Sequence, residues 1–359
     1  MNNYSFEVIT PSELDWKEIE SSFDCTVFHT KKWDEYLSLV GRKHIVVRVR
    51  SNQQIVGFFI GTKRWAGINV IGSPDGGTGT YVQGLCMKNR TSIEERMAIY
   101  EKLVKFFMTK HIAGYIQISD WQLMSRYEDY QPDNQWTMPI LDQLGIHYTL
   151  RSTFIVDTRI EEGQLWANLK YKSCKYPINR ARKMGLWVKC IENKEEIPVF
   201  IDTLSEQISD VSRRKGERRH VHHKKNYLTA LCNSLFPDHV LMLQVRGVLD
   251  DGVEHVMSSA VFCIGKTAST YFSGASNEVF MKYCPNELMV WEAIRILHER
   301  GAGDLIFGGT ASYKKKFGSS YAYLPMMVFS KYSFLFNLRV TIKKAYKRLR
   351  SVSLKPQHR

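Results

Sequence analysis

Residues 285–309 read PNELMVWEAIRILHERGAGDLIFGG, and they carry the clearest local signals of secondary structure in the chain. Pro285 is favourable in the first turn of a helix, and Gly301 is favourable just past its carboxyl end. The apolar residues that follow Asp304 predict a buried strand. Because the strand-forming segment STYFSG (269–274) precedes the helix, the order is strand, helix, strand, which is typical of α/β domains.

The same alternation of strands and helices extends over the rest of the chain. Ser92 and Glu95 have the spacing of a capping box at the start of a helix. A helical stretch over 165–185, interrupted near Pro177, and a further helix after Pro198 are also expected. Strands are expected at 44–49, 54–61, 115–120, 152–158, 186–191, 239–246, 255–263 and 269–274.

The chain divides into two expected domains. Its 359 residues are 44% hydrophobic and 24% charged, which is typical of a globular protein long enough for two domains. The pattern of elements restarts around residues 137–152. We therefore expect a first α/β domain over 1–150, a second over 151–330 and a basic tail over 331–359.

The net charge of +14 is concentrated at one end of the chain. Asp304 is the last acidic residue and 12 Lys and Arg residues follow it, whereas residues 1–304 hold 38 basic and 36 acidic side chains. A protein that binds duplex DNA more often spreads a basic face over its fold. The body is therefore expected to be nearly neutral, and duplex DNA is not an expected partner.

The tail 331–359 has the pattern of a basic amphipathic helix. Apolar residues recur at spacings of three and four, at Leu335, Leu338, Ile342, Ala345 and Leu349. Such a helix without acids suits an anionic membrane surface, at about 1 kcal/mol for each cation near the surface. The alternative is a helix that docks on the body of the protein.

The cysteines and the amino-terminal residues indicate a cytoplasmic protein. No two of the seven cysteines have the CxxC spacing of a zinc ribbon or redox pair, and buried reduced thiols fit the cytoplasm. The start of the chain is polar and acidic, unlike a signal peptide, and no apolar run approaches the ~18 residues of a spanning helix. The histidines of HVHH (220–223) have poor spacing for a metal, so no metal site is expected.

The charge run YKKKFG, residues 313–318, follows the buried strand and a Gly-Gly turn. Lys314 is the expected cation of a site, because Tyr313 and Phe317 flank it and the exclusion of water strengthens a charge contact. The alternative is a solvated hairpin end, which is the interpretation for the next two lysines.

Residues 163–191 contain seven Lys and Arg residues and no acid. An uncompensated basic helix suits a phosphate-bearing ligand, such as a nucleotide sugar, a lipid diphosphate or the end of a tRNA. Arg180 suits bidentate contact with phosphate, and Lys172 is a second candidate. The alternative is a surface helix with solvated lysines.

Asp120 ends the expected strand YIQISD (115–120), where ligand sites of α/β proteins tend to lie. A capping or turn role is the alternative for this residue. The Gly-rich segment GSPDGGTGTY (72–81) lacks the Lys-Ser/Thr of a P-loop. We interpret it as a connection near the site.

Several segments in a fixed order carry a further signal. They are FHTKKWDEYL (28–37), KYKSCKYPINRARKMGLWV (170–188) and a closing series that ends in the pattern aromatic-Lys-x-x-Phe-Gly (313–318). Together they resemble the FemAB/BioF2-like branch of the GNAT acyltransferase superfamily, over roughly residues 23–330.

The resemblance implies two tandem GNAT-like domains and the transfer of an acyl or aminoacyl group to an amine. It also implies that Lys314 is the lysine of the family's aromatic-Lys-x-x-Phe-Gly motif. Arg180 would match the basic residue that the family has on the helix, and Asp120 would match the acid that FemAB-like proteins keep near this strand end. Amine acylation needs a proton acceptor and a donor to the oxyanion. Lys314 and Asp120 are the expected catalytic residues, and the expected substrate-binding residues are Arg180, Lys172, Tyr313, Phe317 and Gly318.

The sequence departs from the standard GNAT pattern at the pyrophosphate loop, Gln/Arg-x-x-Gly-x-Gly/Ala. Its nearest matches, 182–187 and 213–218, both fail at the last position. No cofactor is expected to stay bound, and the co-substrate is left open between acyl-CoA, an acyl carrier protein and aminoacyl-tRNA.

The leading function is N-acyl transfer to a cell-envelope glycan or peptidoglycan-type precursor, on a phosphate-bearing or lipid-linked acceptor at the inner face of the membrane. One alternative is a transferase that builds peptidoglycan bridges from aminoacyl-tRNA. Others are a non-enzymatic nucleic-acid-binding protein and an inactive tandem-GNAT scaffold.

Overall fold

The computed structural model describes residues 3–73, 83–88, 91–127, 139–214, 221–309 and 312–332, together with Phe334 and Thr341. Three features singled out in the sequence lie outside this part of the chain. They are the Gly-rich segment beyond Ser73, the histidine side chains of 220–223 and nearly all of the tail 331–359.

Within the described residues, 14 strands form one continuous mixed sheet. Its order is β1-β2-β3-β4-β6-β14-β8-β13-β12-β11-β10-β9, with β5 paired to β3 and β7 to β14. The strands are β1 (Tyr4–Ile9), β2 (Lys43–Ser51), β3 (Gln54–Trp65), β4 (Asn69–Ser73), β5 (Leu85–Met87), β6 (Tyr115–Ser119), β7 (Ser125–Tyr127), β8 (His147–Val156), β9 (Trp187–Cys190), β10 (Val240–Val248), β11 (Glu254–Cys263), β12 (Ala268–Ser276), β13 (Asp304–Ile306) and β14 (Ser320–Ser330). The helices are α1 (Trp16–Ser22), α2 (Lys31–Leu39), α3 (Ile93–Thr109), α4 (Pro139–Gln143), α5 (Glu162–Asn168), α6 (Tyr176–Lys183), α7 (Ile197–Arg214), α8 (Val221–Leu235) and α9 (Pro285–Glu299).

Each half of the chain contains the same unit, in which a helix connects two parallel strands. In the first half α3 connects β4 to β6, and in the second half α9 connects β12 to β13. Antiparallel strands precede the unit in both halves. The expected α/β class and its tandem arrangement are confirmed.

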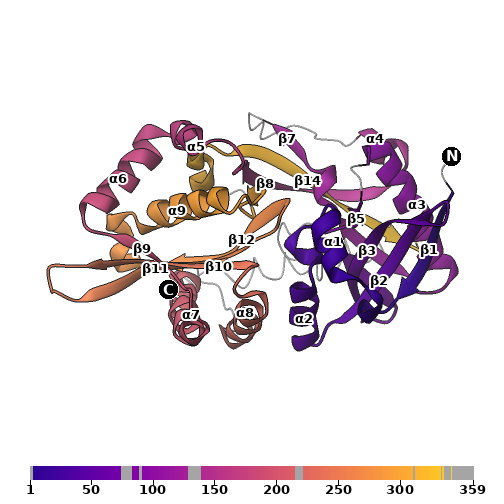
Figure 1. Ribbon diagram of the computed structural model, residues 1–359, viewed down its shortest axis with the longest axis horizontal. Coiled ribbons are helices and arrows are strands. Elements are labelled where there is room, and N and C mark those ends of the chain that lie inside the picture. Colours follow the sequence, from indigo (N-terminus) through magenta and orange to yellow (C-terminus); the bar gives the residue numbers. More distant parts are fainter. Residues whose placement is uncertain are drawn as a thin grey trace, which may run out of the picture.

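Helices cover both faces of the sheet in the second half. Figure 1 shows α5, α6 and α9 above the strands and α7 and α8 below them. Phe262 of β11 packs into the core that contains Trp291 of α9, whereas its neighbour Val261 packs with Leu204 of α7. Consecutive strand residues point to opposite faces, so one strand serves two cores.

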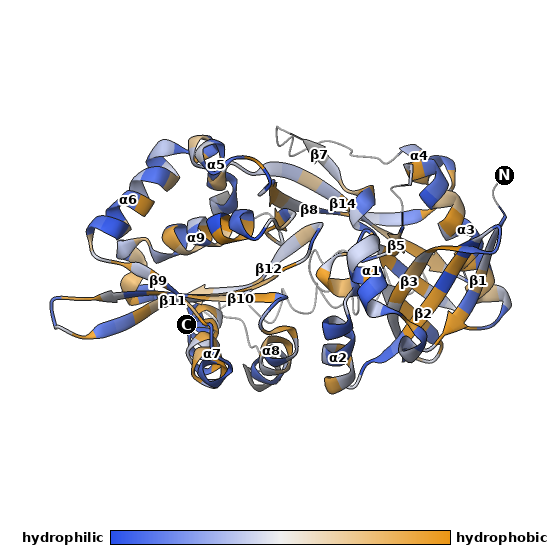
Figure 2. Ribbon diagram, in the orientation of Figure 1, coloured by the Kyte–Doolittle hydropathy of each residue, from blue (hydrophilic) through white to orange (hydrophobic). Residues whose placement is uncertain are grey.

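The first half follows the same rule. Val47 of β2 packs with Leu103 of α3, and the adjacent Val46 packs with Ile19 of α1. Figure 2 shows the result as orange strands between helices that are banded blue and orange. The apolar face of each helix is therefore the one that meets the sheet.

The last described strand, β14, joins the two halves of the sheet. Its residues pair with β8 over the whole register from Ser320 to Val328, and its second part pairs with β6 of the first half. Strand β14 was not among the strands predicted from the sequence. Because β14 belongs to the segment assigned to the second domain, its pairing with β6 means that the two domains share their central strands.

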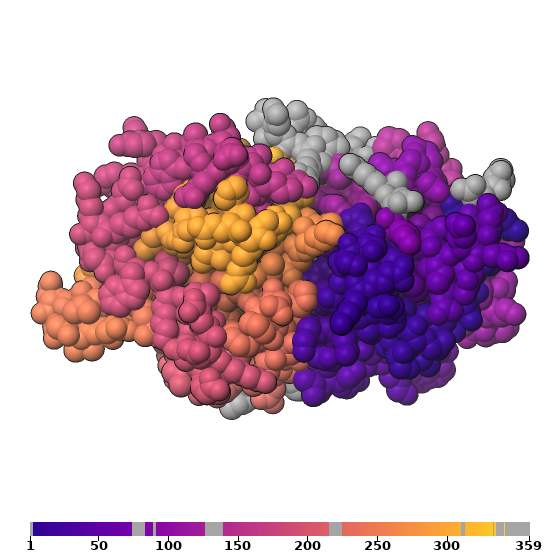
Figure 3. Space-filling model, viewed as in Figure 1, coloured from indigo at the N-terminus to yellow at the C-terminus, as the bar shows by residue number. Residues whose placement is uncertain are grey.

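The first half also reaches across the molecule through α2. Trp33 and Leu37 of α2 share a core with Leu228 and Leu231 of α8. Figure 3 shows the indigo amino-terminal segment directly against the orange part of the second half. The halves therefore contact each other through both the sheet and this helix pair.

Two local expectations are refined by the structure. Ser92 caps α3 by accepting from the backbone N–H of Glu95 at 3.1 Å, but the Glu95 carboxylate accepts from Tyr4 instead of closing a capping box. The helical stretch over 165–185 is interrupted at Leu169 and Lys170, and Pro177 lies in the first turn of α6, where proline is tolerated. Among the described residues, every helix is too short or too polar to cross a bilayer.

Candidate functional site

Lys314 lies in the short helix η8 (Ser312–Phe317), directly above the end of β13. Gly308 and Gly309 have positive φ values of +67° and +88°, which only glycine adopts without strain, and the chain can therefore reverse there. Lys314 is only 6% exposed. Its Nζ donates to the carbonyl oxygens of Phe307 at 2.8 Å and Gly308 at 2.6 Å, whereas a solvated hairpin end would leave it in water.

Burial lowers the pKa of Lys314 to about 8. An ammonium group that has lost part of its water is a less stable cation, so its proton is held less firmly. The ammonium form carries three N–H donors, and the two carbonyls occupy two of them. One N–H donor is left for a ligand.

The surroundings of Lys314 are formed by a fork between two parallel strands. β12 and β13 pair only from Ala268 to Thr270 and from Asp304 to Ile306. Tyr271 is the first residue of β12 beyond this pairing. The Nζ atom of Lys314 lies 5.7 Å from the ring centres of both Tyr271 and Tyr313, within the range of cation–π attraction.

Both tyrosines are neutral hydroxyl groups. Burial raises the pKa of Tyr271, and burial together with the charge of Glu287 raises the pKa of Tyr313. The Tyr271 ring depends on a glycine, because a Cβ atom at Gly274 would lie 2.1 Å from its hydroxyl oxygen. The fork therefore presents one cation and two phenolic hydroxyls.

Lys316 corrects the interpretation of the charge run. We expected it to be solvated, but its side chain forms an ion pair with Glu287 in the first turn of α9, and the two side chains are 14% and 18% exposed. Lys315 is exposed, as expected. The three consecutive lysines thus occupy three different environments.

Phe317 and Gly318 hold η8 in place. Phe317 is 1% exposed, and its ring centre lies 5.8 Å from that of Phe307. Gly318 has φ +68°, and a Cβ atom there would lie 2.8 Å from the Cβ of Asn168. These two expected substrate-binding residues thus pack against β13 and the end of α5.

Arg180 and Lys172 are exposed on α6 and on the preceding turn η5 (Tyr171–Lys175). The charge of Arg180 acts on Cys284, which precedes α9. Burial raises the pKa of that thiol, Glu287 raises it further, and Arg180 lowers it. Among the described residues, neither Arg180 nor Lys172 forms an ion pair with Glu287, which pairs with Lys316.

Asp120 lies in a different, fully buried cluster in the first half. Its Oδ2 atom accepts from the Arg96 guanidinium at 2.7 Å and from the Tyr100 hydroxyl. Its Oδ1 atom caps the turn η4 (Trp121–Leu123) by accepting from the N–H of Gln122 at 2.9 Å. This matches the capping role that we weighed against catalysis, and the structure does not bring Asp120 together with Lys314.

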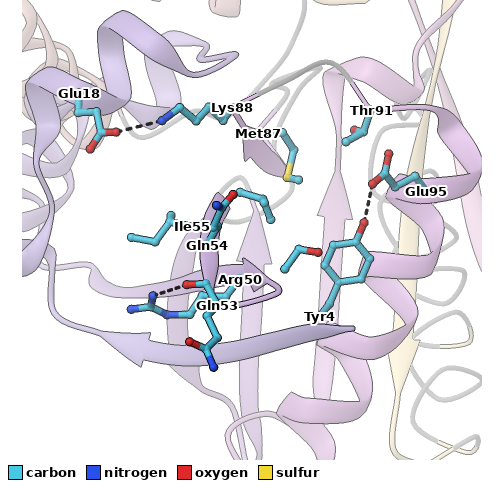
Figure 4. Close-up of a pocket in the computed structure, with 12 residues that line it drawn as sticks. Tyr4, Glu18, Arg50, Gln53, Gln54, Ile55, Met87, Lys88, Thr91 and Glu95 are labelled. Carbon is cyan, nitrogen blue, oxygen red and sulfur yellow. Dashed lines mark hydrogen bonds and ion pairs between the residues drawn. The ribbon is translucent and has the colours of Figure 1, made fainter. Parts of the chain in front are cut away.

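A pocket of about 880 Å³ lies in the first half, between the β2–β3 turn and the start of α3 (Figure 4). Its charged groups have partners within the pocket, since Glu18 pairs with Lys88 at 3.5 Å and Arg50 donates to the carbonyl of Gln53 at 3.1 Å. None of the predicted site residues lines it. In the part of the chain that the structure describes, no three or more His, Cys, Asp or Glu side chains gather in a way that could hold a metal ion.

Tyr271 and Glu287 were not among the site residues predicted from the sequence. Tyr271 falls in the quoted segment STYFSG, two residues inside its start. Glu287 falls in the first turn of the helix that Pro285 opens. The alternation of residues along a strand does not show where two parallel strands stop pairing, and Tyr271 lies just beyond that point. Glu287 is joined to Lys316 only through the packing of α9 against η8.

Residues 170–316 match a family model described as an acetyltransferase (GNAT) domain. The matched segment runs from the basic stretch through the fork to η8, so it contains Arg180, Tyr271, Glu287 and Lys314. A comparison with curated protein sequences gives no match.

Three solved structures resemble the chain over most of its length. FemX has a TM-score of 0.63 at 16% identity, covering 89% of this chain and 96% of FemX. A conserved protein of unknown function from Bacteroides thetaiotaomicron has a TM-score of 0.52 at 11% identity, covering 90% of this chain and 99% of that protein. A tandem GNAT protein from the clavulanic acid biosynthesis pathway has a TM-score of 0.48 at 11% identity, covering 92% and 99%. The chain therefore contains a GNAT-type acetyltransferase domain over residues 170–316, and it shares its fold with FemX over most of its length.

Proposed function

We propose that the chain transfers an acyl or aminoacyl group to an amine on a cell-envelope glycan or peptidoglycan-type precursor. The observation that carries this proposal is the buried cation of Lys314 at the fork of β12 and β13. A cation that keeps one free N–H donor in a water-poor site is suited to stabilise an oxyanion.

In the proposed reaction the amine attacks the carbonyl carbon of the donor, and its carbonyl oxygen becomes negatively charged. The free N–H of Lys314 donates to this oxygen. Glu287 is the carboxylate of the cluster and accepts the proton that the attacking nitrogen releases. A C–N bond forms, the C–S or C–O bond to the carrier breaks, and the thiol or hydroxyl leaves with a proton.

We expect the acceptor substrate to bind over the basic stretch 163–191. Arg180 is exposed on α6 and its charge acts on Cys284 at the start of α9, and a guanidinium is well suited to hold the phosphate of a nucleotide-linked or lipid-linked acceptor. The basic tail 331–359 would bring the protein to the anionic inner face of the membrane. We place the enzyme in the cytoplasm, at this surface.

The acyl donor is proposed by class. The GNAT domain favours acyl-CoA, whereas the departure of 182–187 and 213–218 from the pyrophosphate loop favours an acyl carrier protein or aminoacyl-tRNA. Incubating the purified chain with each donor and an amine acceptor distinguishes the three. The expected result is consumption of one thioester or ester that depends on the acceptor amine.

The matched variants are Lys314→Met and Lys315→Met, which remove a buried and an exposed lysine from the same turn. Lys314→Met should lose at least about a hundredfold in kcat, the typical loss on removing an oxyanion donor, while Lys315→Met keeps full activity. If both variants remain active, Lys314 is not the oxyanion donor. If no donor is consumed by the wild type, the acyl-transfer proposal fails.

Deleting residues 331–359 tests the rival assignment to nucleic acid. Any binding to duplex DNA should disappear with the tail, because the body holds nearly equal numbers of acidic and basic groups. Tight duplex binding by the truncated chain would support the rival.

A further inference from the structure

The helical run formed by η5 and α6 has two different faces. Its inward face is apolar and buried in the core of the second half, and it consists of Cys174, Ile178 and Ala181. Two residues advance a helix by about 200°, so the positions two residues further along lie on the outward face. These positions are Tyr176, Arg180 and Lys183, and all three are exposed. Figure 1 shows α6 at the outer edge of the molecule, with α9 on its inner side.

The outward face carries cations that have no acidic partner. Lys172 of η5 is exposed as well, and the basic stretch to which these residues belong contains no acid. Glu292 approaches from α9, but it pairs with Arg182 at 2.7 Å. Among the residues that the structure describes, Lys172, Arg180 and Lys183 form no ion pair. Their charges are therefore available to an external partner.

Large apolar side chains stand among these cations. Tyr171 is 69% exposed, Tyr176 58% and Met184 40%. Tyrosine is enriched where a membrane meets water, because its ring lies at the level of the lipid head groups while its hydroxyl reaches water. Clustered Lys and Arg side chains are attracted by the negative surface of an anionic bilayer. The combination of unpaired cations and exposed rings is therefore complementary to an anionic lipid surface.

The shape of this surface favours a bilayer over RNA. Cations and exposed rings also attract single-stranded RNA, which binds in a groove that follows its backbone. The outward side of one helix at the edge of the molecule is a ridge, as α6 shows in Figure 1. A ridge can lie on an extended lipid surface, whereas it does not enclose a strand.

The basic stretch also begins beside the turn that carries Lys314. The backbone N–H of Lys170 donates to the carbonyl of Lys316 in η8 at 3.1 Å. On the other side of the same turn, Gly318 packs closely against Asn168 at the end of α5. A bilayer in contact with η5 and α6 would therefore lie next to η8.

We propose that the outward face of η5 and α6 is a contact surface for an anionic lipid bilayer, separate from the tail 331–359. The lipid phosphates contact Lys172, Arg180 and Lys183. The rings of the two exposed tyrosines lie among the head groups. A lipid-linked acceptor would then reach the fork from the membrane, and this last step alone rests on the proposed function.

Co-sedimentation of the full-length chain with vesicles tests the surface. The vesicles consist of phosphatidylcholine alone or of an equal mixture of phosphatidylcholine and phosphatidylglycerol. The wild type should bind the anionic vesicles and lose them as the salt concentration is raised, because salt screens exposed charges. The triple variant Lys172→Gln/Arg180→Gln/Lys183→Gln should bind about a hundredfold more weakly, at about fivefold for each cation. The tail is the same in both proteins, so its contribution cancels.

The matched control is Lys17→Gln/Lys105→Gln/Lys110→Gln, which removes three exposed lysines in α1, in α3 and directly after α3. It has the same net charge as the first triple variant, and it should bind anionic vesicles within a few-fold of the wild type. Both variants change exposed side chains and should melt at the wild-type temperature. Equal vesicle binding by the two triple variants would overturn the proposal, because net charge or the tail would then account for binding.

The variant Tyr171→Ser/Tyr176→Ser keeps all the cations and should weaken binding to anionic vesicles several-fold, and an unchanged affinity would contradict the placement of the rings. Bulk tRNA is the second probe. If the first triple variant loses tRNA binding but binds vesicles like the wild type, the surface serves RNA and the proposal is wrong. Vesicle binding is measured without acyl donor or acceptor, so its failure is distinguishable from a failure of acyl transfer.

Discussion

Removing the charge of Lys314 should change how the stability of the protein depends on pH. The wild-type chain must bury an ammonium group, and this lowers the pKa of Lys314 from its usual 10.5 to about 8. At about 1.4 kcal/mol for each pKa unit, the shift corresponds to about 3 kcal/mol of folding free energy. The folded protein bears this full cost wherever both the folded and the unfolded lysine are protonated, which is below pH 8.

The sign follows from proton binding. Between about pH 8 and 10.5 the unfolded lysine still holds the proton that the folded lysine has released, so stability rises with pH over this range. Relative to Lys314→Met, the wild type should therefore gain about 3 kcal/mol in its free energy of unfolding across this range, and most of it by pH 10. Methionine has a similar length and no charge, which makes it the appropriate reference.

Urea denaturation of both proteins at half-unit steps from pH 6.5 to 10 measures the difference. Other groups that titrate at alkaline pH, such as Cys232 and Tyr271, are present in both proteins and cancel. Lys315→Met, which removes an exposed lysine, should parallel the wild type throughout. A difference between wild type and Lys314→Met that stays flat over this range would mean that Lys314 has an ordinary pKa and is not buried as described.

Three further predictions concern the buried Asp120–Arg96 pair, the packing of Phe317 beneath η8 and the position of the Tyr271 ring. Asp120→Asn should lower the free energy of unfolding by about 3–5 kcal/mol, because it leaves the Arg96 guanidinium buried without its counter-charge. An unchanged denaturation midpoint would show that the pair is not buried. Phe317→Ala should lower the free energy of unfolding by about 3–5 kcal/mol, because it leaves a cavity beneath η8. Phe334→Ala changes an exposed position and serves as the reference in the same thermal melt. Gly274→Ala should reduce kcat/KM by about a hundredfold, because its Cβ would displace the Tyr271 ring, and full activity would exclude Tyr271 from the site.

Much of the fold could be predicted from the sequence because most elements carry their own local signals. The helix at 285–299 is opened by Pro285 and followed by Gly301, and the structure has both boundaries as expected. Strand β14 was missed for a physical reason. It contains Pro325, which lacks an N–H for the sheet, and its partners β6 and β8 are distant in sequence.

The candidate site could be predicted only in part. The flanking aromatic residues of Lys314 are visible in the sequence, and they correctly indicate a lysine withdrawn from water. The pairing of Lys316 with Glu287 was not foreseeable, since it joins two segments through the packing of α9 against η8. Asp120 has the same position at a strand end as many ligand-binding acids, and only the buried Arg96 distinguishes it.

Strand β14 also has a consequence for how the protein is made. Strand β6 is complete after residue 119, yet one of its neighbours is supplied by residues 326–330. During synthesis, about 200 further residues must leave the ribosome before this edge is covered. Unpaired strand edges promote aggregation, so we expect nascent chains that stall before residue 320 to depend on chaperones, although most of their helices are already present.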